Sequence, residues 1–517
     1  MLEWDEHEAR YRLHDLAQIF ADKSLESPER RAAQGRHALH YAKVARAAYD
    51  VIVSRRPESV SQGFKLFYSD WMNMAAGQAW AALNIDRNEQ AAQLCREYAT
   101  RAPYFHLIKN DPTELVRWLE AAVRADRRLS DKRTEAVDLG LLGGVQLLVG
   151  DLRNATKSRE RALSLSRDIG DRRTEADELH QLSELFAMQH QTRKAIDYGE
   201  SALVIHRELN DFSKEADALA KLGELYERKD DHARSIQYYQ SAIEINHQLN
   251  RRLEEGQNLV GLGLADKNTS QAIPNLEAAV KIFRELGETS QEANTLLSLA
   301  ERYRVVKEVS RSVEASQNAA ELFNQLGDRN SAATALMLAG TSYMDSSQSE
   351  KAISYAERSL EIAREIGAQE LVILNLQVLV SVHGQFGRVD LVDNKTESAV
   401  RHFKLNLAAA KEIRALNRPL PQYMEADALL ALGLISATQK NLLDPMKYLT
   451  EGLNIARSTV SKEEEAKIQD SLSAVFYSMG DRERAIESAK AALMIFENLG
   501  DGNAAKVRKR LASYQAA

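Results

Sequence analysis

A unit of about 40 residues recurs through most of this chain, and no other feature restricts its fold as strongly. An acidic residue followed by alanine marks most copies, and the first three copies lie 40 residues apart. The next copy is degenerate, with Glu255 and Gly256 in these positions, and it is three residues shorter. A fixed period of this length indicates a solenoid, in which each unit buries its apolar face against its neighbours. The pair occurs as Glu135-Ala136, Glu175-Ala176, Glu215-Ala216, Glu292-Ala293, Glu425-Ala426 and Glu465-Ala466.

Each unit is predicted to form two helices joined by a polar turn. Apolar or small residues recur at i, i+3, i+4 and i+7 in the first half and at i, i+3, i+6 and i+7 in the second, and both spacings place them on one helix face. Glycine-aspartate pairs at 170–171, 327–328 and 500–501 separate units: the glycine ends one helix and the aspartate caps the next. In the unit 210–249 the two faces contain Leu219, Leu222, Gly223 and Tyr226, then Ile236, Tyr239, Ala242 and Ile243.

Small residues recur at fixed places in both helices, so we expect neighbouring helix backbones to approach closely there. The positions are Gly143, Gly223, Gly263 and Gly340 in the first helices, and Ala162, Ala202, Ala242, Ala279 and Ala319 in the second helices.

This pattern resembles the tetratricopeptide repeat, in a 40-residue rather than a 34-residue form. The resemblance implies an all-α, right-handed superhelical solenoid of antiparallel helix pairs, with the first helix of each pair on the concave face. About nine repeats are expected over 131–500, followed by a C-terminal capping helix over 501–517.

One unit, near 368–420, is longer than the others. From Ile373 to Ala426 the spacing is 53 residues, and the surplus is assigned to 395–416, where an overlong second helix is predicted. Pro419 and Pro421 would then end that helix. The surplus is either a tolerated insertion or a docking element that interrupts the solenoid.

The N-terminal residues are outside the repeat. The stretch RYRLHDLAQIFADKSL (10–25) resembles the end of the winged-helix domain in bacterial STAND signalling ATPases with an NB-ARC-type core. The stretches LFYSDWMNMAAGQAWAAL (66–83) and LVRWLEAAVRADRRLSDKRTEA (115–136) resemble the segments that follow in that family. We therefore interpret 1–27 as a winged-helix remnant and 28–130 as a helical adaptor region.

Four helices are expected in the adaptor region, near 29–55, 61–82, 88–102 and 112–129. Met1–Arg12 are expected to be irregular, with no sheet larger than a stray strand near Tyr11.

The resemblance implies the sensor region of a STAND ATPase without its ATPase core. The sequence contains no G-x-x-x-x-G-K-[ST] motif to cradle phosphates, so we expect no ATP binding. The chain would be either a fragment cut at a domain boundary or a free-standing relative. His14 and Asp15 would form a hinge contact in the full-length family.

Composition favours a folded cytoplasmic protein and argues against several partners. The net charge is −7 and no basic stripe stands out, so nucleic acid is not expected to bind. The single cysteine excludes an internal disulfide framework and fits a reducing cytosol. No apolar run is long enough for a membrane span, and the first residues lack a signal peptide.

No constellation for catalysis, cofactor binding or metal binding is evident, so we expect a protein that is not an enzyme and uses no cofactor. His37 and His40 lack a second ligand pair, and Cys95 is expected to be a buried structural thiol. The glycines of GLLGG (140–144) and GLG (261–263) are expected inside helices rather than in nucleotide loops.

The candidate ligand groove follows from the register of the first helices. It should pass from acidic to apolar along its length and bind a protein or peptide whose apolar segment is flanked by basic residues. The alternative is that the apolar members pack under neighbouring helices. The groove residues are Asp177, His180, Glu184, Asp217, Glu224, Glu227, Val260, Leu264, Leu297, Glu301, Arg304, Met337, Thr341 and Met344.

Three functions fit these observations. The first is a sensor that binds a protein or peptide inducer and relays it to an NTPase module. The second is a free-standing scaffold for assembling protein complexes, and the third is a peptide-pheromone receptor or regulatory phosphatase built on such repeats.

Overall fold

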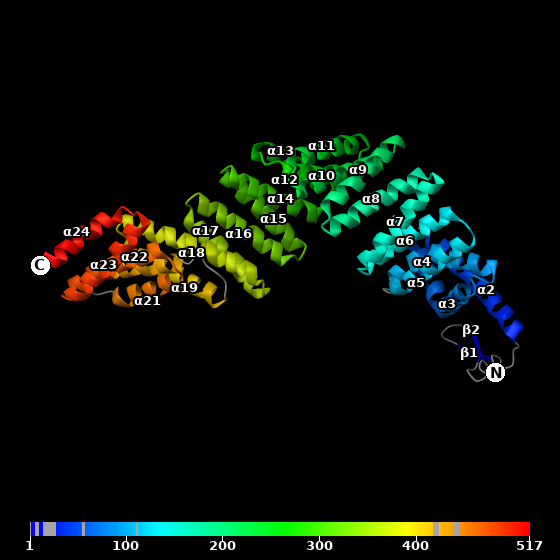
Figure 1. Ribbon diagram of the computed structural model, residues 1–517, viewed down its shortest axis with the longest axis horizontal. Helices are drawn as coiled ribbons and strands as arrows, with labels where there is room; N and C mark the ends of the chain where they lie inside the picture. The colour runs from blue at the N-terminus through cyan, green and yellow to red at the C-terminus, as the bar shows by residue number, and fades with distance from the viewer. Residues whose placement is uncertain are drawn as a thin grey trace. The chain divides into compact units, whose positions relative to one another are not determined.

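The computed structural model describes residues 2–5, 10–13, 27–53, 57–109, 112–416, 423–438 and 445–516. The chain divides into two compact units, unit 1 (Met1–Arg251) and unit 2 (Arg252–Ala517). Within each unit, helices follow one another in chain order and pack on their sequence neighbours (Figure 1). The all-α superhelical solenoid of helical repeats predicted from the sequence is confirmed.

Unit 1 opens with two short strands, β1 (Leu2–Asp5) and β2 (Arg10–Leu13), which pair antiparallel. The expectation of an irregular start was therefore wrong for these residues. Both segments alternate apolar and charged residues, and the register sets Glu3 opposite Arg12 and Asp5 opposite Arg10. Oppositely charged cross-strand pairs favour such a hairpin. His14 and Asp15, expected to form a hinge contact, lie outside the described residues.

The helices of unit 1 confirm the four expected before residue 130 and continue as helix pairs. They are α2 (Ser27–Val53), α3 (Pro57–Leu83), α4 (Glu89–Lys109), α5 (Pro112–Arg128), α6 (Lys132–Leu148), α7 (Leu152–Ile169), α8 (Arg172–Met188), α9 (Thr192–Glu208), α10 (Phe212–Arg228) and α11 (His232–Gln248).

Unit 2 continues the same alternation of helices. They are α12 (Arg252–Ala265), α13 (Thr269–Leu286), α14 (Thr289–Val305), α15 (Val309–Gln325), α16 (Arg329–Asp345), α17 (Ser349–Glu365), α18 (Gln369–Val392), α19 (Thr396–Ala415), α20 (Tyr423–Thr438), α21 (Pro445–Ser458), α22 (Lys462–Ser478), α23 (Arg482–Leu499) and α24 (Asn503–Ala516). The division of the chain into remnant, adaptor, repeats and cap stays a prediction.

Aromatic residues hold the first helices of unit 1 together. Trp71 of α3 stacks on Trp118 of α5 with ring centroids 5.4 Å apart, and both side chains are buried. The Tyr98 hydroxyl of α4 donates to the Ala38 carbonyl of α2 over 2.8 Å. Trp80 of α3 is half-buried. These contacts tie α2, α3, α4 and α5 into one cluster that continues into α6.

The turns at the glycine-aspartate pairs have the predicted structure, in which glycine ends one helix and aspartate caps the next. Gly170 adopts the left-handed conformation with φ +69°, and the Asp171 carboxylate accepts a hydrogen bond from the backbone N–H of Thr174. The same pair of roles recurs at 327–328. These two turns are therefore specified locally by a glycine that tolerates positive φ and by an N-cap carboxylate.

The recurrent Glu-Ala pair has a structural explanation in an ion pair between successive repeats. In five of the six pairs the alanine is buried and the glutamate binds the arginine eight residues earlier, at the end of the preceding helix, over 2.7–2.9 Å. In the sixth pair Glu425 binds Arg414 over 3.3 Å. A carboxylate that is almost buried needs such a partner. We call these contacts inter-repeat ion pairs. They are Arg127–Glu135, Arg167–Glu175, Arg207–Glu215, Arg284–Glu292 and Arg457–Glu465.

The overlong unit differs from its prediction. The surplus was assigned to the second helix, but α18 has 24 residues and α19 has 20, against 17 in α16 and α17. The first helix therefore takes the larger share. The cause is an uninterrupted helical pattern in α18, where buried residues continue through Gly387 to Asp390. Pro419 and Pro421 lie outside the described residues.

The small-residue positions do allow close packing, but not always against a backbone. A Cβ added at Gly340 would lie 3.3 Å from the Ala352 carbonyl oxygen, so two helix backbones meet there as expected. At Gly223 the nearest atoms instead belong to the Tyr239 ring, at 3.0 Å. The expectation of backbone contact was wrong at Gly223, because a large aromatic side chain of α11 fills the space.

Candidate functional site

The first helices of the pairs present the predicted groove residues at the surface. None of the fourteen is buried: Asp177 and Leu264 are exposed and the other twelve are half-buried. Six lie on α8 and α10 of unit 1, and eight lie on α12, α14 and α16 of unit 2. The acidic and the apolar sets thus belong to different units, and each set is described by itself. Their role as a ligand surface stays a prediction.

In unit 1 two of the five acidic groove residues, Asp217 and Glu224, are paired with cations. Glu224 binds Lys221 over 2.8 Å and also pairs with Arg228, one turn further along α10. Asp217 binds Arg251 over 2.9 Å. This surface is consequently less acidic than the sequence predicted, because cations on α10 and after α11 form ion pairs with these carboxylates.

A histidine lies in the same region of unit 1. His180 Nε2 is 3.7 Å from Glu184 Oε1 on α8. Burial lowers the pKa of His180, and this outweighs the opposing effect of the Glu184 carboxylate. The imidazole is therefore neutral at physiological pH and can donate or accept a hydrogen bond.

In unit 2 the groove residues are mainly apolar. Leu264 on α12 is 42% exposed. Leu297 on α14 and Met337 on α16 are half-buried, and each packs with one side against a buried cluster of its unit. Val260 and Met344 are placed in the same way. These side chains therefore combine the two alternatives predicted from the sequence: they pack against the core on one side and line the surface on the other.

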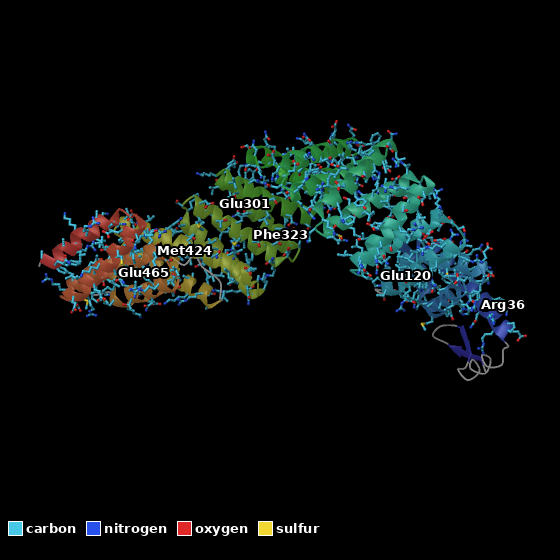
Figure 2. All side chains as sticks on the ribbon, viewed as in Figure 1. Arg36, Glu120, Glu301, Phe323, Met424 and Glu465 are labelled. Carbon is cyan, nitrogen blue, oxygen red and sulfur yellow. The ribbon has the colours of Figure 1, made fainter. Side chains whose placement is uncertain are left out.

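The polar groove residues of unit 2 connect two first helices. Arg304 binds Glu301 over 2.6 Å within α14 and Asp345 of α16 over 2.7 Å. Glu301 is labelled in Figure 2. The Thr341 hydroxyl donates to the Leu338 carbonyl over 2.8 Å, so it is bound by its own helix. A charged strip thus borders the apolar side chains of α14 and α16.

Sequence reasoning missed several exposed apolar residues of the first helices, among them Val305 and Leu374. Val305 on α14 is 56% exposed and Leu374 on α18 is 45% exposed. Val305 follows Leu297 and Glu301 at successive four-residue steps, and this spacing was the available signal. We use the name apolar face for Leu264, Leu297, Val305 and Met337.

The candidates for other chemistry have structural roles. Cys95 is buried, and burial raises the pKa of its thiol to about 12, which disfavours the reactive thiolate. The glycines of GLLGG and GLG lie inside α6 and α12. His37 and His40 lie on α2, and no group of three or more His, Cys, Asp or Glu in the described ranges could hold a metal ion.

No helix in the described ranges is both long enough and apolar enough to cross a bilayer. The absence of catalysis stays a prediction.

Family models match two parts of the chain. The model for soluble NSF attachment protein matches residues 130–298, and a tetratricopeptide-repeat model matches residues 333–366. The chain therefore contains helical repeats of the tetratricopeptide type. No curated protein matches the sequence.

Solved structures with similar folds share little sequence with this chain. A signal transduction ATPase with numerous domains (STAND) and a tetratricopeptide repeat sensor, from Pyrococcus horikoshii, is 14% identical with a TM-score of 0.42, covering 97% of this chain and 68% of that one. Aspartyl phosphate phosphatase F from Bacillus subtilis is 13% identical with a TM-score of 0.40, covering 75% and 95%. The apo form of RapI is 14% identical with a TM-score of 0.40, covering 54% and 99%.

Proposed function

We propose that this chain is a protein-interaction module that binds a peptide or protein segment on the apolar face of unit 2. The observation that carries the proposal is the row of apolar side chains on three successive first helices. Leu264 and Val305 are 42% and 56% exposed, whereas Glu224 and Arg228 occupy the corresponding positions on α10 of unit 1. Aligned apolar side chains at a surface typically mark a contact site.

The chemistry of the face indicates what it would bind. Leucine and valine offer a hydrophobic surface, and Met337 can adapt its shape to different partner side chains. Glu301 and Asp345 border the face with side chains 46% and 41% exposed. The partner expected is therefore a segment with apolar anchors next to a basic residue, which could lie across the first helices.

Selection of peptides from a random display library on the full chain tests this proposal. The affinity of a selected peptide is then measured by fluorescence anisotropy for the wild type and for the double variant Leu264→Asp, Val305→Asp. We choose these two positions because they are more exposed than Leu297 and Met337, so their substitution disturbs the core least. A loss of affinity of at least tenfold is expected.

The control places the same substitution on second helices. Leu405 on α19 and Met494 on α23 are 45% and 61% exposed, which is close to the exposure of the tested residues. The variant Leu405→Asp, Met494→Asp should bind the peptide as the wild type does. Equal affinity in the wild type and the apolar-face variant would contradict the proposal, provided that both melt at the same temperature.

A finer proposal is that binding is relayed to an NTPase module, as the N-terminal resemblance to STAND ATPases suggests. Fusing an NB-ARC-type ATPase ahead of residue 1 should give an activity that changes when the selected peptide is added. An activity independent of the peptide, with peptide binding intact, favours the scaffold. Peptide-pheromone reception is a narrower form of the same binding and requires a defined peptide sequence.

A further inference from the structure

A second site, unrelated to the apolar face, is present in unit 1. A cavity of about 700 Å³ is lined by residues of α3, α5, α6 and α7. This volume lies within the range of roughly 300–1,000 Å³ that is typical of small-molecule sites. None of the predicted groove residues lines it, and we call it the basic cavity.

The rim of the basic cavity concentrates positive charge in a chain whose net charge is −7. Five cations and one carboxylate line the cavity, and the carboxylate is Glu120, which is labelled in Figure 2. One of the cations, Arg127, is paired with Glu135. Four further cations on the rim are exposed and form no ion pair or hydrogen bond within the part of the chain that the structure describes. They are Arg117, Arg124, Lys157 and Arg161.

Four like charges around one hollow repel one another unless a counter-ion is present. Some exposed arginines of unit 1 are paired with carboxylates, as Arg172 is with Glu175 and Glu208, whereas these four rim cations surround one hollow without such partners among the described residues. The unpaired cations of the rim are therefore available to a ligand. An anion held between α5 and α7 would relieve their repulsion.

Nearly buried polar side chains also line the cavity. Gln78, Gln146 and Ser158 are 5%, 6% and 8% exposed. The Ser158 hydroxyl donates to Gln146 Oε1 over 2.8 Å, which leaves the amide N–H groups of Gln146 as donors. Among the described residues neither these groups nor the Gln78 amide has a hydrogen-bond partner. These amide donors are accessible from the cavity, so the oxygens of a ligand could accept hydrogen bonds from them.

We propose that the basic cavity binds a small oligoanion that carries two or more phosphate groups. Guanidinium groups match the geometry of phosphate oxygens, and four of the five lining cations are arginines, three of them on α5. A small cavity lined by several cations favours a compact ligand with a high negative charge density, and a ligand with several phosphate groups has this property. The site uses side chains alone, so it does not need the backbone loop whose absence led us to expect no ATP binding.

Calorimetric titration of the full chain with tripolyphosphate tests the assignment. We expect one site per chain, with an affinity that weakens as salt is raised. The double variant Arg124→Ala, Lys157→Ala should bind at least tenfold more weakly. The matched control is Arg128→Ala, Arg153→Ala, which removes the same charge from the exposed surfaces of α5 and α7 without touching the cavity. The control should change the affinity less than twofold.

Two further measurements distinguish a specific phosphate-binding site from a nonspecific patch of positive charge. Gln146→Leu keeps every cation and should still weaken binding at least threefold, because the ligand loses a buried donor. Citrate, which carries similar charge without phosphate groups, should bind at least tenfold more weakly than tripolyphosphate. The proposal is overturned if tripolyphosphate does not bind, if citrate binds equally well, or if the control variant loses as much affinity as the cavity variant. Circular dichroism of each variant confirms that it is folded.

Discussion

The first helices of the two units have the same kind of buried side, which we call the frame. They differ on their exposed side, which we call the face. On α10 of unit 1 the surface residues are charged and paired, as Glu224 is with Lys221. On α14 of unit 2 the corresponding surface contains Leu297 and Val305. The buried side of both helices nevertheless holds the same fully buried alanine and the same inter-repeat ion pair. The frame is therefore set by packing, whereas the face is free to acquire a function.

The largest effect is expected where the frame is most tightly packed. Gly223→Leu should destabilise the protein by about 3 kcal/mol, because the new side chain meets the Tyr239 ring. Ala220→Leu, on the half-buried face of the same helix, should cost less than about 0.5 kcal/mol. Thermal denaturation of both variants measures the difference. Equal melting temperatures would mean that frame and face are not distinguished on α10.

A second prediction concerns two buried carboxylates whose negative charge is not fully compensated by neighbouring cations. Asp126 of α5 and Asp138 of α6 are both buried, and Arg96 of α4 contacts Asp126 over 2.8 Å. Burial raises the pKa of Asp126, and the neighbouring Asp138 carboxylate raises it further. Between the ordinary pKa near about 4 and this raised value, the folded protein binds more protons than the unfolded one. Stability from this pair therefore falls as pH rises through that window.

The variant Asp126→Asn tests this sign. Asparagine mimics the protonated acid, so the variant should be more stable than the wild type by about 1–2 kcal/mol at pH 8 and about equal at pH 4. Denaturant unfolding at both pH values measures it. A gain that is the same at pH 4 and pH 8 would show that titration of Asp126 is not the cause.

The inter-repeat ion pairs should respond to pH in the opposite direction. Burial alone would raise the pKa of Glu175, but hydrogen bonds from Arg167 and Arg172 lower it below the usual value. Its contribution to stability is therefore present above the ordinary carboxyl pKa and is lost as pH falls through the lowered value.

On α10, Glu215→Ala should cost about 1 kcal/mol at neutral pH, since the carboxylate is nearly buried and Arg207 is about half exposed. Glu224→Ala on the face of the same helix is the control, and it should cost less than about 0.5 kcal/mol. Urea titrations compare the two. A larger loss for Glu224→Ala would reverse the assignment of frame and face.

The smallest effect is expected at a turn. Val460 has φ +58° and is 74% exposed, whereas glycine occupies the left-handed position in the turns at 170, 327 and 500. Val460→Gly should stabilise the protein by about 0.5 kcal/mol, because relief of strain exceeds the entropy cost of glycine. The melting temperature should rise by about 1 °C or less for a chain of this size. A decrease would show that Val460 contributes packing outside its turn.

The amino-acid sequence by itself determined the repeat, because its signals are local. The 40-residue period, the glycine and aspartate of each turn, and the helical spacing of apolar residues act within a few residues of one another. The Glu-Ala pair was visible as well, although its meaning required the arginine eight residues earlier. This arginine was overlooked because the contact joins two helices across a turn.

Tertiary structure decided what lies between helices. The groove residues were placed on the first helices by register, but only packing showed that Glu224 is neutralised and that Leu297 borders the core. The basic cavity was missed, and no basic stripe was noted, because Arg124 and Lys157 lie on separate helices and are distant in sequence. Local periodicity determines which side of a helix is buried. Which charges meet across a hollow depends on how the helices pack, and no single segment of sequence encodes it.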